Sequence, residues 1–213
     1  YGPNQFSFAF PGGAADPVPQ LDSSLLFSGA QYLSLPAGQL ARFYARLPQG
    51  VQAYTWAVLG GSNIVAAATP RAFSCYNNFG GAVCKGITLS LDTAAPEQAL
   101  RAQHLQGAAT FPAVVTGAVV RLYGSSGLVT VEPTPRAIVN QQTITATWAL
   151  AFGAVLYDTS IVPRIGCDPA GAGQYLTGRL FYLALLRGSL ASEDLSLYSR
   201  LLSEGVKPWT VRQ

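Results

Sequence analysis

Charged residues are scarce in this chain. They make up only 11% of its 213 residues, whereas hydrophobic residues make up 49%. The coat of charge that usually keeps soluble monomers apart is therefore thin, and much of the surface must be neutral or apolar. Because extended apolar surface tends to mark an interface, the composition favours a secreted module that faces glycans or a subunit that other subunits cover.

The sequence also lacks the features of nucleic-acid-binding and membrane proteins. Its formal net charge is only +3 and its basic residues are scattered, whereas nucleic acid is normally bound by clustered Lys and Arg. No stretch sustains the roughly 18 apolar residues that a membrane-spanning helix needs. The chain starts at Tyr1 without Met or a signal-peptide pattern, which indicates a processed or excised product. We expect no nucleic-acid partner and no membrane insertion.

Catalytic residues are as sparse as charge. The one histidine, His104, is accompanied by no Gly-x-Ser-x-Gly motif, and a phosphate-binding Gly-x-x-x-x-Gly-Lys-Ser/Thr loop is absent from the sequence. Retaining glycosidases need two carboxylates roughly 5 Å apart, but the only close acidic pair, Glu193 and Asp194, lies at the start of a predicted helix. We therefore expect no enzymatic activity.

The sequence contains few candidate metal ligands. One histidine and no Cys-x-x-Cys pair argue against zinc. Asp92, Asp158 and Asp168 lie in loop-like sequence and could supply oxygen ligands to calcium, which takes roughly six to eight of them. No acidic cluster accompanies them, and such aspartates more often end strands. We expect no cofactor, with calcium as the one alternative.

Two of the three cysteines, Cys75 and Cys84, bracket a segment rich in turn formers, and the third is Cys167. Asn and Gly residues between the first two predict that the chain doubles back, which would bring the sulfurs close enough for a disulfide. The alternative is a pair of reduced, buried thiols, because a count of cysteines does not fix the redox compartment.

The bracketed segment also holds the best candidate for ligand contact. Tyr76, Asn77, Asn78 and Phe79 offer two amides for hydroxyl groups and two rings for the apolar face of a sugar. This chemistry suits carbohydrate and also suits protein recognition. The alternative is a turn whose asparagines only satisfy the backbone.

Alternating apolar and polar residues predict many strands. Residues 25–35 are typical of two paired strands around a glycine turn, and residues 124–127 of a hairpin turn. Trp56 and Trp148 lie at strand positions where we expect them to pack in the core. Further strands are predicted at residues 53–59, 64–68, 86–91, 113–123, 128–132, 142–149 and 179–186.

One helix is convincing, over residues 192–203. Ser192 is a suitable cap, Glu193 and Asp194 suit the positive end of the helix dipole, and Gly205 follows the last turn. Many strands with one late helix predict an all-β fold, a two-sheet antiparallel jelly-roll sandwich with one short helix near the C-terminus. The expected buried stripe of the helix is Leu195, Tyr198, Leu201 and Leu202.

The first twenty residues form an arm rich in Pro and Gly. In it Phe6, Phe8 and Phe10 alternate with small residues, which predicts a short strand with one apolar face. This strand either folds back on its own sandwich or serves as an assembly arm that adds to a sheet edge of a neighbour. We expect an arm at 1–20, one domain at 21–205 and a tail at 206–213.

Several segments resemble a known family. Residues 22–36 resemble the opening of laminin-G-like jelly rolls, residues 54–58 the next family strand with its Trp in the core, and residues 165–166 and 175–190 the closing run. Ala191 stands where that family usually has a capping Ser or Thr. The chain thus resembles the concanavalin A-like lectin/glucanase superfamily, which implies glycan binding, cell-surface recognition, or capsid and tail-fibre construction. These motifs specify packing and not activity.

Two functional hypotheses follow. The first is a non-enzymatic structural or decorating subunit of a larger assembly, such as the capsid decoration or tail fibre of a virion, with other protein subunits as partners in a homo- or hetero-oligomer. The thin charge, the aromatic arm and the missing catalytic residues favour it. The alternative is a carbohydrate- or receptor-binding lectin-like module. The expected location is the virion or the extracellular space.

Overall fold

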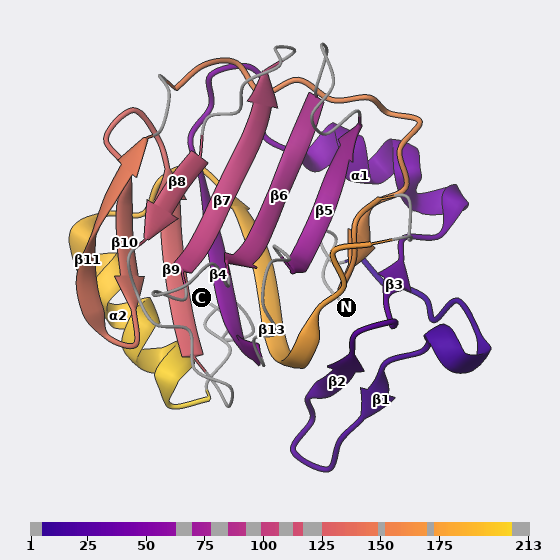
Figure 1. The fold of residues 1–213 in the computed structure, drawn as a ribbon. Coiled ribbons are helices and arrows are strands. Elements are labelled where there is room, and N and C mark those ends of the chain that lie inside the picture. The colour runs from indigo at the N-terminus through magenta and orange to yellow at the C-terminus, as the bar shows by residue number, and fades with distance from the viewer. Residues whose placement is uncertain are drawn as a thin grey trace.

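The computed structural model describes residues 6–62, 70–77, 85–92, 99–106, 113–116, 125–148, 152–169 and 173–205. In this part of the chain thirteen strands form one hydrogen-bonded series that folds over into two facing sheets (Figure 1). Every strand pairing is antiparallel. The predicted all-β, two-sheet antiparallel jelly-roll sandwich is therefore confirmed.

The strands divide between a front sheet and a back sheet. The front sheet consists, in spatial order, of β8 (Ala113–Thr116), β7 (Ala99–Gln106), β6 (Lys85–Asp92), β5 (Arg71–Asn77), β12 (Arg164–Ile165) and β3 (Leu33–Ser34). The back sheet consists of β1 (Val18–Pro19), β2 (Leu25–Ser28), β13 (Thr177–Arg187), β4 (Tyr54–Ser62), β9 (Ser125–Val131) and β10 (Arg136–Val139).

The strand β11 (Gln142–Trp148) joins the two sheets. Its first half, up to Thr145, pairs with β10 of the back sheet, and its second half, from Ala146, pairs with β8 of the front sheet. A strand that changes sheets in this way makes a corner of the sandwich.

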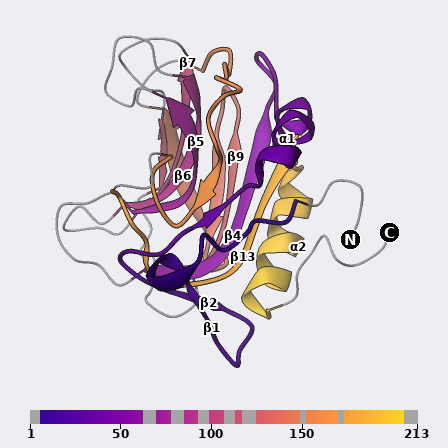
Figure 2. The ribbon, with the colours of Figure 1, turned by 90° about the vertical axis from the view of Figure 1, so that its right-hand side faces the viewer.

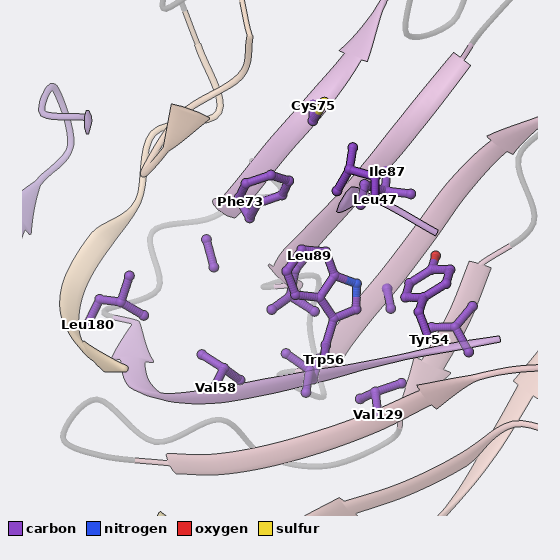
Figure 3. Close-up of a cluster of buried hydrophobic side chains, with 14 of the residues drawn as sticks. Leu47, Tyr54, Trp56, Val58, Phe73, Cys75, Ile87, Leu89, Val129 and Leu180 are labelled. Atoms are coloured by element: carbon purple, nitrogen blue, oxygen red, sulfur yellow. The ribbon is translucent and has the colours of Figure 1, made fainter. Parts of the chain in front are cut away.

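The core lies between the sheets (Figure 3). Trp56 of β4 is only 1% exposed, and its ring lies 5.2 Å from that of Phe73 on the opposite sheet. The predicted core position of Trp56 is confirmed, and because side chains alternate between the faces of a strand, Trp56 shares the inner face with Tyr54 and Val58. The side chain of Trp148 lies outside the described part of the chain.

The helix α2 (Ser192–Ser203) has the predicted bounds and covers the outer face of the back sheet (Figure 2). Leu195 and Leu202 pack there against Leu128 and Ile138. The predicted cap was wrong. Ala191 is the extended residue at the N-cap position, and Ser192 is already helical, with its hydroxyl accepting a hydrogen bond from Arg136 Nη1 at 3.1 Å.

A second helix, α1 (Leu40–Arg46), was not predicted. It has only seven residues, follows a short 3-10 turn (Ala37–Gln39), and has no acidic residue in its first turn and no side-chain cap. An acidic first turn and a side-chain cap are signals by which a helix start is recognised in sequence, and α1 has neither. Among the described residues no helix is long and apolar enough to cross a membrane.

Two predicted turns differ from the structure. The segments β2 and β3 do not pair with each other; β2 pairs with β1 and β13 in the back sheet, and β3 with β12 in the front sheet. The predicted hairpin turn at 124–127 was also wrong, because Ser125–Val131 is a strand. A Cβ on Gly127 would lie 2.7 Å from a methyl group of Leu100, so this glycine permits close packing of the sheets.

The described part of the arm folds back on its own sandwich. Ala9 exchanges backbone hydrogen bonds with Ser34 at 2.8 and 3.0 Å. The ring of Phe6 lies 5.2 Å from that of Phe43, and the ring of Phe8 lies 6.4 Å from that of Phe73. Phe10 is 48% exposed. The structure shows the fold-back alternative, and a role of these residues in assembly stays a prediction.

Candidate functional site

The structure separates two residues that the sequence placed in one ligand-binding loop. Tyr76 and Asn77 are consecutive on β5, so their side chains lie on opposite faces of the front sheet. Tyr76 is 6% exposed and donates its hydroxyl hydrogen to Gln174 Oε1 at 3.0 Å. The ring is therefore not presented to a ligand. Asn78 and Phe79 lie outside the described residues.

Asn77 instead helps to hold one end of the sandwich together. Its Nδ2 donates to Asp158 Oδ2 at 2.8 Å, and its Oδ1 accepts a hydrogen bond from the Lys85 backbone N–H at 2.9 Å. The side chain thus ties the segment around Asp158 to the β5–β6 pair. These bonds engage the Asn77 amide within the protein, and a role of Asn77 in ligand contact stays a prediction.

A pocket of about 500 Å³ lies beside this junction, lined by residues of α1, by Lys85 at the start of β6 and by residues between 155 and 159. Its volume is within the range typical of small-ligand sites, roughly 300 to 1,000 Å³. We call it the rim pocket. Its lining residues are Tyr44, Ala45, Gln49, Gly50, Lys85, Val155, Leu156, Tyr157 and Thr159.

Three segments distant in sequence build the rim pocket, and hydrogen bonds tie two of them together. Gln49 Nε2 donates to the carbonyl oxygen of Tyr44 at 3.1 Å. The Val155 backbone N–H donates to the carbonyl oxygen of Gly50 at 2.7 Å. The Tyr44 hydroxyl donates to the Ile161 carbonyl oxygen at 2.6 Å. The pocket is therefore part of a bonded framework, which keeps its shape defined without a ligand.

The lining combines polar and apolar groups. Lys85 provides an ammonium group, Thr159 a hydroxyl and Gln49 an amide. Leu156 is 40% exposed and supplies apolar surface, together with Val155. Among the described residues that line the pocket, none is acidic. Such a mixture suits a small polar molecule that has one apolar face.

The two tyrosines of the lining stay neutral. Burial is the main reason why the pKa of Tyr44 and that of Tyr157 are raised above their usual value. Their hydroxyls differ in bonding: Tyr44 donates to Ile161, whereas the buried Tyr157 hydroxyl has no hydrogen-bond partner. An uncharged hydroxyl of this kind can donate a hydrogen bond.

This difference predicts unequal effects on stability. Tyr44→Phe is expected to lower the free energy of unfolding by about 1 to 2 kcal/mol, because the Ile161 carbonyl loses its donor. Tyr157→Phe removes no hydrogen bond and should change it by less than about 0.5 kcal/mol. Urea denaturation of the two variants measures both values. Equal destabilisation by the two would show that the Tyr157 hydroxyl is bonded in solution.

The outer face of the front sheet carries a buried polar cluster that the sequence did not reveal. Arg71 is 1% exposed, and its Nε donates to Gln174 Oε1 at 2.8 Å. Its Nη1 donates to Ser90 Oγ at 3.0 Å and to Gln103 Oε1 at 3.1 Å. Its guanidinium carbon also lies 5.6 Å from the ring centre of Tyr76. Because Arg71 is buried and bonded to residues of β6 and β7, we assign it a structural role.

Of the three aspartates considered for calcium, the structure describes the side chains of Asp158 and Asp168. Asp158 Oδ1 accepts hydrogen bonds from the Ser160 hydroxyl at 2.6 Å and the Ser160 backbone N–H at 3.0 Å, which hold the pKa of Asp158 below its usual value. The side chains of Asp92 and His104 lie outside the described part. No group of three or more His, Cys, Asp or Glu residues that could hold a metal occurs among the described residues. Calcium binding stays a prediction.

The two described cysteines are buried free thiols. Cys75 Sγ lies 3.3 Å from the Tyr44 hydroxyl. Burial raises the pKa of both Cys75 and Cys167 to about 12, so both remain protonated near neutral pH. Cys84 lies outside the described residues. The structure gives no support to a Cys75–Cys84 disulfide, which stays a prediction.

Comparisons with known proteins define the class of fold. No protein-family model and no curated protein matches the chain. A structure described as showing that cell entry of botulinum neurotoxin type C depends on interaction with two ganglioside molecules is similar, with a TM-score of 0.60 at 7% identity. The match covers 94% of this chain and 47% of that one, so the chain spans about half the length of the toxin chain.

Two smaller domains are also similar. Domain 4 of an extracellular arabinanase from Geobacillus stearothermophilus, in complex with arabinotriose, has a TM-score of 0.58 at 12% identity, over 88% of this chain and 82% of that one. The CBM40 domain of the Ruminococcus gnavus IT-sialidase has a TM-score of 0.56 at 12% identity, over 83% and 96%. The structural neighbours are thus β-sandwich domains that belong to toxins and enzymes, several of them solved with a saccharide. At these identities the likeness concerns the fold.

Proposed function

We propose that this chain is a non-catalytic, lectin-like module of the laminin-G-like and concanavalin-like type, which binds a saccharide outside the cell. The rim pocket is the observation that carries this proposal. Its lining joins an ammonium, an amide and a hydroxyl with an exposed leucine. The similarity to sandwich domains solved with arabinotriose and sialyllactose supports the same class of ligand.

The arrangement of the lining fits a sugar ring. One face of a pyranose is largely apolar and would lie against Leu156 and Val155. Its hydroxyl groups would then meet Gln49, Thr159 and Lys85, which line the same pocket. Because the backbone hydrogen bond from Val155 N–H to the Gly50 carbonyl oxygen already joins two of these segments, little ordering of them is needed on binding.

The packing of the arm weakens one argument for the other hypothesis, that the chain is a structural subunit of a virion. Phe6 and Phe8 pack on their own core, so two of the three arm aromatics are occupied within the chain. The low content of charged residues still favours this hypothesis. Light scattering on the purified chain over a range of concentrations tests this hypothesis. A discrete oligomer or a growing polymer would support it.

Blocking the rim pocket is expected to abolish saccharide binding. The purified chain is first applied to an array of neutral, sialylated, uronic and sulfated saccharides, with calcium and with a chelator. Ala45→Trp then places an indole in the pocket from an exposed position of α1, and affinity should fall at least about tenfold, which is about 1.4 kcal/mol. Titration calorimetry with the best saccharide measures the change.

Ala41→Trp is the matched control, because Ala41 is exposed one turn earlier on α1 and does not line the pocket. A helical side chain leans toward the N-terminus of its helix, so this indole should point away from the pocket. Affinity should be unchanged. Absence of binding to the whole array would contradict the proposed function, and binding unaffected by Ala45→Trp would place the site elsewhere on the sandwich.

A further inference from the structure

Of the described residues that line the rim pocket, one is charged, and it is a cation. Lys85 is half-buried at the start of β6. It is one of only two lysines in the chain, which otherwise uses arginine. The described ion pairs are Arg136 with Glu132 and Arg179 with Asp22, so neither involves Lys85.

Asp158, on whose carboxylate the charge of Lys85 acts, is already engaged by other groups. The Asp158 carboxylate accepts hydrogen bonds from Ser160 and from Asn77, all of them neutral donors. These bonds are the main reason for the lowered pKa of Asp158, and the charge of Lys85 is the smallest of its causes. The carboxylate is therefore satisfied without Lys85, and the two groups do not form an ion pair.

Among the described residues that line the pocket, none offers Lys85 an acidic group. A neutral sugar could be held by Gln49 and Thr159 alone, so it would not require a cation here. An anionic group that enters the pocket would gain a charge-assisted contact, and such contacts are stronger than those between neutral groups. The backbone of Lys85 is fixed by Asn77, which holds the root of its side chain at the pocket.

We propose that the rim pocket selects an acidic saccharide, whose carboxylate or sulfate group pairs with Lys85. This inference rests on the proposed function and adds the chemical class of its ligand. The apolar face of the sugar lies against Leu156, its hydroxyls meet Gln49 and Thr159, and its negative group lies at the Lys85 ammonium. Binding should weaken as salt rises, because a partly exposed pair of charges is screened.

Three ligands on one core test the proposal: lactose, 3′-sialyllactose with a carboxylate, and lactose 3′-sulfate. Titration calorimetry on the intact chain should show at least one acidic ligand binding about tenfold or more tightly than lactose. Lys85→Gln should weaken that ligand about tenfold and leave lactose within about twofold. Lys85→Arg keeps the charge and should retain most of the affinity. The preferred acidic ligand tells a carboxylate site from a sulfate site.

Arg200→Gln is the matched control, since Arg200 is an exposed residue of α2 that does not line the pocket, and the substitution removes the same charge. It should leave all affinities unchanged. If Arg200→Gln and Lys85→Gln weakened the binding of the acidic ligand equally, the effect would come from the overall charge of the protein and not from pairing with Lys85, which would overturn the inference. Lys85→Met provides a second neutral variant should Lys85→Gln unfold. Failure of both acidic lactoses to bind, or acidic affinities no greater than that of lactose, overturns the inference. The proposed function would then still stand if a neutral saccharide binds on the array and Ala45→Trp abolishes its binding.

Discussion

Replacing Gly86 with alanine is expected to lower the free energy of unfolding by more than about 3 kcal/mol. The residue has φ +128°, and a Cβ there would lie 1.9 Å from the Cys75 carbonyl oxygen and 2.5 Å from Tyr76 Cα. These are backbone atoms of the paired strand β5, so they cannot rotate away as a side chain would. The strands must separate locally, next to Lys85 and the rim pocket. Urea denaturation measures the loss.

Gly188→Ala separates the two causes of this effect. Gly188 also has a positive φ, +92°, but nothing lies within 4 Å of the position that its Cβ would occupy. It should therefore show only the backbone cost, about 1 to 2 kcal/mol. A similar loss in both variants would mean that β5 and β6 adjust to the extra methyl group without cost, and that the close approach at Gly86 is not a constraint.

The sequence predicted best those elements whose local signals agree with their surroundings. The helix α2 has acids at its start, a glycine after its end and an apolar stripe facing the back sheet, so its end signals and its periodicity together located it. Trp56 lies on a strand whose inner face is apolar throughout, and alternation placed it in the core. In such elements the local pattern and the tertiary packing require the same residue types.

Predictions failed where one sequence pattern has two structural solutions. A glycine between two short apolar runs indicated a hairpin at residues 25–35, but the chain crosses to the other sheet there. Tyr32 donates its N–H to the Ala15 carbonyl oxygen and Leu35 to that of Pro163, so partners distant in sequence decide the path. At Gly127 a glycine that resembles a turn former serves close packing within a strand.

The candidate site was predictable only in part. Alternation along β5 could have shown that Tyr76 and Asn77 face opposite ways, since this follows from strand geometry. The rim pocket could not have been found, because its walls come from residues 44–50, Lys85 and residues 155–159. None of these residues belongs to a motif. Their proximity depends on the crossing of the chain over the end of the sandwich.

Arg71 illustrates a further limit and yields the second large expected effect. An arginine at the start of a strand is usually solvent-exposed, and the strands predicted from the sequence do not include Arg71–Asn77. In the structure Arg71 is buried and donates hydrogen bonds to Gln174, Ser90 and Gln103. Arg71→Met should lower the free energy of unfolding by about 3 kcal/mol, because several buried acceptors lose their donor at once.

Arg187→Met is the control, since Arg187 is exposed and donates a single described side-chain hydrogen bond, to Gln52 at 2.9 Å. Its loss should cost less than about 0.5 kcal/mol. Arg71→Lys should recover only part of the stability, because one ammonium group cannot reproduce the planar fork that reaches residues of β6, β7 and Gln174. Equal stability of Arg71→Met and the wild type would show that an apolar side chain replaces the network without loss. The outer face of the front sheet would then owe its polar character to something other than stability, which would make it the next surface to test for saccharide binding.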